Sequence, residues 1–234
     1  MNTAIAESVI EGWFEKMKRK QTKQLYIAGC LLAAFVLWTI LVCRIDVRQI
    51  GPNGSCVGFA SLNGFVHSLT GVSMMLYTIT DWLGLIPLCI VLGFAVFGLV
   101  QWIRRKDIRL VDQSILILGG FYLVVAAVYL FFEVIVINAR PILINGVSET
   151  SYPSSTTMLA LCVMPTAILQ FRQRIQSLKL RQCVCRGAGV FTVFMTVGRL
   201  LSGVHWFTDI IGGILVSCGL VLLYDAAVQS GSNR

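Results

Sequence analysis

Six long apolar runs leave this chain few possible folds. A run of about 20 apolar residues spans the hydrocarbon core of a bilayer. Inside lipid every backbone N–H and C=O needs an internal partner, and within a single segment only a helix supplies it. The sequence therefore predicts an all-α fold, an integral membrane bundle of about six transmembrane helices. We place these helices at Leu25–Cys43, Trp82–Ile103, Ser114–Ile137, Ser154–Phe171, Gly187–Val204 and Phe207–Tyr224.

The composition excludes a soluble domain. Hydrophobic residues make up 56% of the 234 residues, charged residues only 13%, and the mean hydropathy is +0.80. A typical soluble domain carries about 25% charged residues. The first apolar run is expected to remain as a membrane anchor, because a polar lead of 24 residues precedes it and no A-x-A-like cleavage site follows.

Most of the positive charge falls on one side of the predicted bundle. The Lys and Arg of segments 16–23, 104–109 and 172–186, together with Arg234, make up fifteen of the 19 in the chain. The positive-inside rule then places both termini in the cytoplasm and three loops outside. Because these residues flank the apolar runs, we assign the net charge of +8 to contacts with membrane lipids and not with nucleic acid.

The sequence divides into three parts. Residues 1–24 form a cytoplasmic amphipathic segment, expected either as a short helix on the inner membrane surface or as an extension of the first helix. Residues 25–226 form the six-helix membrane domain, and residues 227–234 form a cytoplasmic tail. Within the longest outer loop, Phe59–Ile79 is moderately apolar. This stretch is expected to lie along the outer interface or to re-enter the bundle over a site.

Polar residues that a bundle in lipid does not need fall at the outer ends of the helices. Pro141 ends the third helix and leaves Arg140 at the outer mouth, where an arginine can also simply snorkel to water. The fourth helix opens with residues 152–156, Y-P-S-S-T. Such a start caps the helix and directs free N–H groups and the positive dipole end at one point, which suits a phosphate. We therefore predict phosphate contacts at this helix start, from Ser154, Ser155 and Thr156.

The junction of the fifth and sixth helices carries the most specific group of residues. Arg199 ends the fifth helix, and His205 precedes Asp209 by four positions at the start of the sixth. On a helical turn this spacing makes the two side chains neighbours. A carboxylate so placed can fix the tautomer of the imidazole. The spacing therefore predicts His205 as a nucleophile toward phosphorus, with Asp209 behind it.

These motifs resemble the type 2 phosphatidic acid phosphatase superfamily, the membrane lipid phosphate phosphatases. The family signature is K-x6-R-P, then P-S-G-H, then S-R-x5-H-x3-D, and its order and spacing match over Glu133–Asp209. The resemblance implies a six-helix fold and a metal-independent, cofactor-free phosphohistidine mechanism at the outer face. It also implies the roles of five residues: His205 as nucleophile, Asp209 as its orienting group, and Arg140, Ser154 and Arg199 as phosphate ligands.

The chain departs from the family signature at three positions. Gly198 replaces a serine, Glu133 replaces the lysine of the first motif, and Thr156 replaces the histidine that serves as general acid. An ionised Glu133 would repel a phosphate, so we expect it to be protonated or paired with Arg140 or Arg199.

The replacement at Thr156 narrows the expected substrates. A threonine hydroxyl does not protonate a leaving alkoxide at neutral pH, whereas a leaving phosphate needs no acid because its second pKa is about 6. We therefore expect a lipid diphosphate, such as a polyprenyl diphosphate, or else a lipid phosphate, with water or another lipid as acceptor. Glu149 and Tyr152 are alternative proton donors.

Two other classes of protein remain open. A pseudo-phosphatase that binds or moves phospholipid headgroups would need the arginines but not an oriented imidazole, so the His205–Asp209 pair favours an enzyme. A channel or transporter would be favoured by inverted repeats, and the sequence has no internal repeat.

Overall fold

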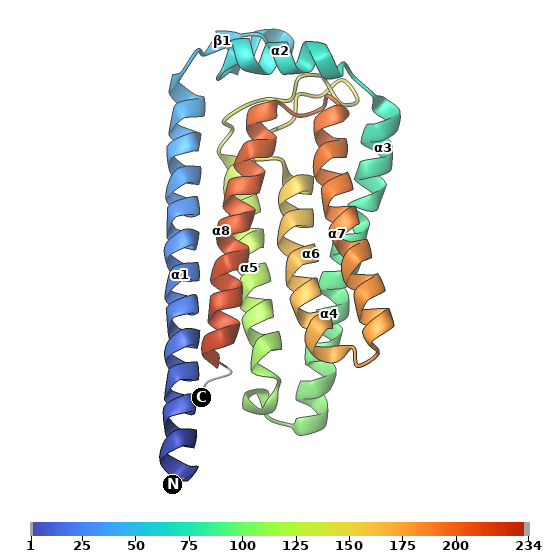
Figure 1. Ribbon diagram of the computed structural model, residues 1–234. Coiled ribbons are helices and arrows are strands. Elements are labelled where there is room, and N and C mark those ends of the chain that lie inside the picture. Colours follow the sequence, from blue (N-terminus) through green and yellow to red (C-terminus); the bar gives the residue numbers. More distant parts are fainter. Residues whose placement is uncertain (1, 232–234) are drawn as a thin grey trace.

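Eight α-helices account for most of the residues that the structure describes. The computed structural model describes the backbone of residues 2–231 and the side chains of residues 18–231. The long helices run side by side along one axis, and α2 lies across one end (Figure 1). A two-stranded antiparallel sheet, β1 Arg48–Gln49 and β2 Cys56–Val57, joins α1 to α2. The helices are α1 Asn2–Arg44, α2 Ala60–Thr70, α3 Met74–Leu83, α4 Leu85–Arg105, α5 Gln113–Val134, α6 Ser155–Arg174, α7 Leu178–Leu201 and α8 Phe207–Gly231.

Five segments of the described chain are long and apolar enough to cross a membrane: 18–44, 74–105, 113–134, 178–201 and 207–231. The fourth predicted span, α6, is not among them, but it lies inside the bundle against α7 and α8 (Figure 1). Its buried side chains include Thr157, Thr166 and Gln170, which face protein and not lipid. The prediction of an all-α membrane bundle of about six helices is confirmed, and the protein is a multi-pass membrane protein.

Two helices begin earlier than predicted. The second crossing starts at Met74, not at Trp82, because α3 leads into α4 with only Gly84 between them. The fifth starts at Leu178, not at Gly187. In both cases polar residues interrupt the apolar run without ending the helix. The stretch Phe59–Ile79 is accordingly divided, since α2 lies across the end of the bundle while α3 belongs to a crossing.

The N-terminal segment is a continuation of α1. Of the two expectations for residues 1–24, the helical extension is the one found, since α1 runs unbroken from Asn2 to Arg44. At 1.5 Å per residue this helix is about 65 Å long, roughly twice the thickness of the hydrocarbon core. The predicted tail also begins as helix, because residues 227–231 belong to α8. Residues 232–234 lie outside the described part of the chain.

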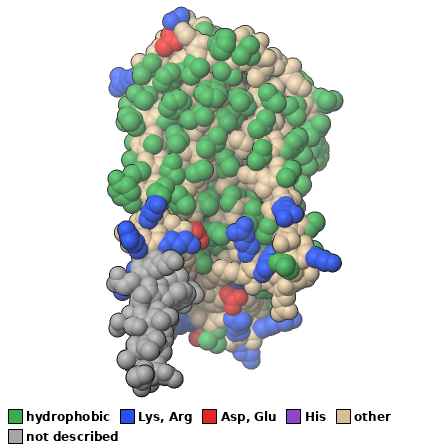
Figure 2. All heavy atoms as spheres, viewed as in Figure 1, with side chains coloured by type: hydrophobic (Ala, Val, Ile, Leu, Met, Phe, Trp, Pro, Cys, Tyr) green, Lys and Arg blue, Asp and Glu red, His purple; other side chains and the backbone are tan. Residues whose placement is uncertain are grey.

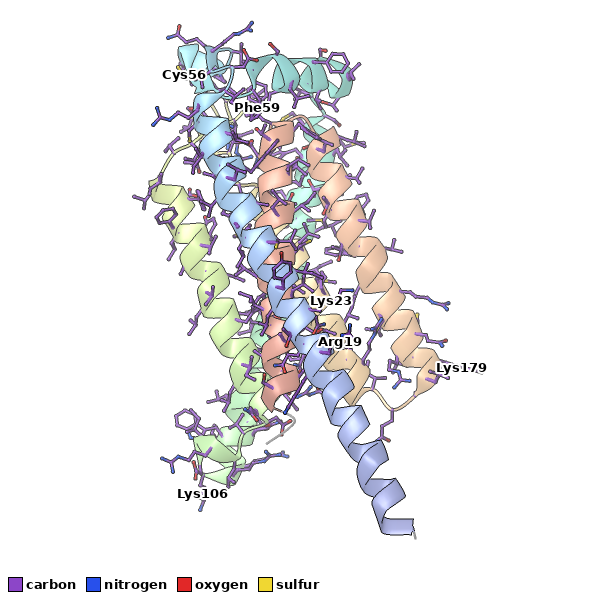
Figure 3. The ribbon with its side chains drawn as sticks, turned by 60° about the vertical axis from the view of Figure 1, so that its left-hand side comes forward. Arg19, Lys23, Cys56, Phe59, Lys106 and Lys179 are labelled. Carbon is purple, nitrogen blue, oxygen red and sulfur yellow. The ribbon has the colours of Figure 1, made fainter. Side chains whose placement is uncertain are left out.

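The surface separates a basic end from an apolar body. Hydrophobic side chains cover the middle and the α2 end of the face in Figure 2, and most of the Lys and Arg gather toward the opposite end. Lys106 and Lys179 lie toward that basic end, whereas Cys56 and Phe59 lie at the α2 end (Figure 3). The first turns of α1 and the last turns of α8 also lie toward the basic end (Figure 1). The sequence likewise places most of the Lys and Arg on one side of the predicted bundle.

Candidate active site

His205 lies in the short turn that joins α7 to α8, and only 3% of it is exposed. The segment between α2 and α3 packs directly onto this turn, where the Ser73 N–H donates to the Ser202 carbonyl. Gly203 has a φ of +68°, and a Cβ there would lie 1.9 Å from the Gly71 carbonyl oxygen. Only glycine fits both the left-handed backbone and this close approach.

The two nitrogens of the His205 ring have different surroundings. Nδ1 lies 3.0 Å from Ser151 Oγ and 3.2 Å from the Ser151 carbonyl oxygen. Its distance to Asp209 Oδ2 is 3.9 Å, which is too long for a hydrogen bond. The Ser151 hydroxyl bridges the gap, because it also donates to Asp209 Oδ2 at 2.5 Å. Nε2 has no hydrogen-bond partner among the described residues.

Asp209 connects three segments of the chain at the start of α8. Its Oδ2 accepts from the Trp206 N–H at 2.9 Å, and its Oδ1 accepts from the Asn138 side chain at 3.1 Å. The Asp209 carbonyl accepts from the Ser154 N–H at 3.1 Å, which ties α8 to the start of α6. A carboxylate in the first turn of a helix is also stabilised by the helix dipole. The acid is therefore fixed in place before any ligand binds.

Both arginines that the sequence predicts as phosphate ligands are held by carboxylates. Arg140 Nε lies 3.1 Å from Glu149 Oε2. Arg199 is 1% exposed, and its Nη1 lies 3.6 Å from Asp81 Oδ1. The ring of Tyr77 lies near both guanidinium groups, with centroid distances of 5.9 Å to Arg140 and 5.0 Å to Arg199. The α3 helix thus contributes a cover over the two cations, with Tyr77 and Asp81 four residues apart on it.

The glycine at position 198 allows this approach of α3. A Cβ on Gly198 would lie 2.9 Å from Thr80 Cγ2, closer than side chains normally pack. Thr80 is buried, and its hydroxyl accepts from Arg199 Nη1 at 3.3 Å. The serine that the family signature places at 198 would therefore push α3 away from α7.

A polar cavity of about 420 Å³ opens beside His205. Its lining includes six of the residues singled out from the sequence: Glu133, Arg140, Glu149, Tyr152, Ser155 and His205. The remaining predicted residues lie around it. The Ser154 hydroxyl donates to Thr157, Arg199 lies beneath α3, and Asp209 lies behind Ser151. Thr156 lines a second, mainly apolar cavity of about 520 Å³ between α4, α5 and α6. The roles of all these residues stay predictions.

The pairing expected for Glu133 is not the one found. Arg140 pairs with Glu149 and Arg199 pairs with Asp81, whereas Glu133 Oε2 accepts from the Thr150 hydroxyl at 3.2 Å. The reason is the fold of the connection before α6, where the Arg140 N–H donates to the Glu149 carbonyl and brings the two side chains together.

Tyr152 is poorly placed as the alternative proton donor. Its hydroxyl is hydrogen-bonded to Thr39 at 2.7 Å, and only 2% of the residue is exposed. Burial raises the pKa of this phenol, which makes it a weaker acid. Of the two alternative donors, Glu149 is the one with a side chain open to solvent on the cavity wall.

Sequence reasoning missed several residues at this site. Ser151 stands two positions before Pro153, but nothing in its spacing marks it as a partner of His205. Tyr77 and Asp81 fell in a stretch taken for a loop, although their i, i+4 spacing is typical of one helix face. That spacing, read together with the cap at Ser73, was the available signal for α3.

A known family matches the C-terminal part of the chain. The PAP2 superfamily model matches residues 134–230. Phosphatidylglycerophosphatase B of Bacillus subtilis (strain 168) is 36% identical over 78 residues, which is 33% of this chain and 37% of that protein. The alignment thus spans little more than a third of that relative.

A solved structure is similar over most of the chain. The crystal structure of the first transmembrane PAP2-type phosphatidylglycerolphosphate phosphatase from Bacillus subtilis superposes with a TM-score of 0.56 at 20% identity. The superposition covers 86% of this chain and 94% of that one. Residues 134–230 thus match the PAP2 superfamily, and the chain shares its overall fold with that structure.

Proposed function

We propose that this protein is a membrane lipid phosphatase that works through a phosphohistidine at His205. The proposal rests on the hydrogen bonding of the two nitrogens of the His205 imidazole. Its Nδ1 is held by Ser151, whereas its Nε2 has no partner among the described residues and the ring lines the polar cavity. A nucleophile needs a lone pair that no hydrogen bond occupies, together with a fixed orientation.

The proposed reaction has two steps. The Nε2 lone pair attacks the terminal phosphorus of a lipid diphosphate, the bond to the bridging oxygen breaks, and the lipid monophosphate leaves with the electron pair. Water then attacks the phosphohistidine, the N–P electrons return to Nε2, inorganic phosphate leaves, and the proton of the water goes to solvent. Transfer to a lipid hydroxyl in place of water is a variant of the second step.

Positive groups around the cavity support phosphate binding. Arg140 and Ser155 line it, and the first N–H groups of α6 begin at Ser155 beside them. Arg199 lies close enough for its charge to act on His205. A phosphate dianion would compete with Glu149 and Asp81 for the two guanidinium groups. In this proposal Arg140, Ser154, Ser155, Thr156 and Arg199 bind the phosphate.

We propose a lipid diphosphate as the first candidate substrate and a lipid monophosphate as the second. The Bacillus subtilis relative is named for phosphatidylglycerophosphate, a phosphate monoester, so lipid phosphate monoesters are the second candidate class. Thr156 favours the diphosphate, because a leaving phosphate needs no proton donor. The apolar cavity suits the lipid chain, since it shares Tyr129, Ser155 and Met158 with the polar one.

The proposed orientation places both termini in the cytoplasm and the site at the non-cytoplasmic face. The clustering of Lys and Arg at the end opposite α2 supports it (Figure 2). Cys56 and Cys183 are exposed, free thiols near opposite ends of the bundle. In single-cysteine variants on intact cells, an impermeant maleimide is expected to label Cys56 and not Cys183. The reverse pattern would invert the topology.

Trapping of the intermediate tests the proposed activity. Purified protein is mixed with a prenyl diphosphate labelled at its terminal phosphate and quenched in alkali, and acid-labile label is expected on His205. His205→Gln is expected to carry none, while His67→Gln is labelled normally. Absence of label with lipid binding retained would favour the alternative, a pseudo-phosphatase. We further propose that no metal or cofactor takes part, so labelling should persist in EDTA.

The pH dependence of kcat/KM is expected to follow His205. Burial and the positive charges of Arg199 and Arg140 hold the pKa of His205 well below its ordinary value of 6.5. The ring is then neutral and nucleophilic at neutral pH, and kcat/KM should fall only on an acid limb below pH 6.5. Two substrates with different phosphate pKa values identify this limb, because it stays in place when the substrate changes. An enzyme limb above pH 7 would contradict the assignment.

Removal of the Tyr77 ring is expected to weaken phosphate handling. The ring stacks near both arginines, and each cation–π contact contributes about 0.5–2 kcal/mol. Tyr77→Ala should therefore lower kcat/KM by roughly tenfold, whereas Tyr77→Phe keeps the ring face and should remain near wild type. A thermal melt of each variant controls for folding. Equal losses in both variants would assign the effect to the hydroxyl and not to the ring.

A further inference from the structure

The hydroxyl of Ser151 stands between the two groups that the family signature pairs directly. His205 Nδ1 and Asp209 Oδ2 are 3.9 Å apart, whereas Ser151 Oγ is 3.0 Å from the nitrogen and 2.5 Å from the carboxylate oxygen. All three residues are at most 3% exposed. Interactions between such groups are stronger than in water because the surroundings are weakly polarisable.

The direction of these hydrogen bonds follows from the number of protons. A serine hydroxyl has one proton and two lone pairs, and an ionised carboxylate only accepts. The Ser151 proton therefore points to Asp209, and its oxygen accepts from His205 Nδ1–H. The Ser151 carbonyl, 3.2 Å from the same nitrogen, can also only accept. Both groups of Ser151 thus require the proton on Nδ1 and leave the lone pair on Nε2.

The fold holds Ser151 in this position independently of the imidazole. The Ser151 N–H donates to the Asn138 carbonyl at 2.9 Å. The side chain of the same Asn138 donates to the other oxygen of Asp209 at 3.1 Å. One asparagine thus fixes both the serine and the carboxylate, so the distance between them is set by the connection that follows α5.

We propose that Ser151 is a positioning residue that transmits the charge of Asp209 to His205. This inference rests on the proposed function, because the ring needs a stabilising negative charge only when Nε2 bonds to phosphorus and the ring becomes cationic. The two hydrogen bonds, from His205 Nδ1–H to Ser151 Oγ and from Ser151 Oγ–H to Asp209 Oδ2, then stabilise the positive ring without moving a proton onto Asp209. The sequence S-Y-P at 151–153 therefore serves the nucleophile as well as the start of α6.

Nitrogen-15 NMR of histidine-labelled protein tests the proposal without turnover. The chain has only two histidines, and His67→Gln assigns the signals. Wild-type His205 is expected as the Nδ1–H tautomer. In Ser151→Ala the backbone carbonyl should preserve this tautomer, but the titration midpoint should fall, because the imidazolium loses its link to Asp209. An Nε2–H tautomer in the wild type, or an unchanged midpoint in the variant, would overturn the inference.

Kinetics provide the second readout. Ser151→Ala is expected to lower kcat by about 10- to 100-fold with KM nearly unchanged, the size expected for one charge-assisted hydrogen bond. Ser151→Thr retains the hydroxyl and should recover most of the loss. Ser217→Ala is the matched control, because it removes another buried hydroxyl, which donates to the Met158 carbonyl, away from the imidazole.

A double-mutant cycle separates transmission from packing. If Ser151 acts through Asp209, Ser151→Ala should cost nothing further in the Asp209→Asn background. An equal loss in both backgrounds would show that Ser151 acts by itself, and the proposal fails. If the wild type hydrolyses no lipid phosphate or diphosphate, the proposed function fails, and the NMR titration still decides the role of Ser151.

Discussion

His205→Gln is expected to lose turnover of a lipid diphosphate by a factor on the order of 10⁴ or more. The variant loses the nucleophile, so hydrolysis would have to proceed by direct attack of water on phosphorus without the covalent step. The amide roughly retains the volume of the ring, and the residues proposed to bind phosphate are untouched. We therefore expect the affinity for a non-hydrolysable diphosphonate lipid to change by less than about threefold.

The matched control for this variant is His67→Gln. His67 packs its ring on Trp206, with centroids 5.5 Å apart, and its Nε2 lies 3.2 Å from the Gly203 carbonyl. It therefore touches the turn that carries His205 without lining the cavity. The control is expected to lose stability by about 1 kcal/mol and to keep most of its turnover. Residual turnover above a tenth of wild type in His205→Gln would contradict the phosphohistidine mechanism.

The helical bundle was largely predictable because lipid leaves one solution for an apolar run. The start of a helix was predicted wrongly where a polar residue contacts a distant residue of the same chain. Asp81 interrupts the second run but faces Arg199, so α3 and α4 continue the crossing across it. In α6, which was predicted from Ser154 and begins at Ser155, Gln170 likewise bonds to Tyr224 inside the bundle. Hydropathy cannot distinguish such residues from loop residues, since their partners are distant in sequence.

The site was predictable only in part. Motif spacing selected Arg140, Ser155 and His205, and the fold brings these three to one cavity. The spacing did not reveal that Ser151 would lie between His205 and Asp209. That contact depends on the irregular connection between α5 and α6, whose path is set by single backbone bonds such as the one from Ser151 to Asn138. Irregular chain of this kind has no periodicity from which its contacts could be inferred.

Introduction of the missing acid is expected to change the substrate range. In Ser155→Gly/Thr156→His the second motif becomes P-S-G-H. A general acid contributes about 10²–10⁴-fold to a reaction whose leaving group needs a proton. Hydrolysis of phosphatidic acid, which expels an alkoxide, should therefore rise by about 100-fold or more. Hydrolysis of a prenyl diphosphate should change by less than about fivefold, because its leaving group departs as a phosphate.

The structure has room for this exchange. Thr156 lines the cavity between α4, α5 and α6, and its Cγ2 lies 3.6 Å from where a Cβ of Gly84 would be. An imidazole at 156 can extend into that space, next to position 155, where the wild-type serine borders both cavities. Ser155→Gly alone and Ser155→Gly/Thr156→Asn are the matched controls, since they alter shape without adding an acid. Equal gains on both substrates would mean that the change improves binding. No gain on phosphatidic acid, together with a fast wild type, would instead assign the acid to Glu149, which already stands on the cavity wall.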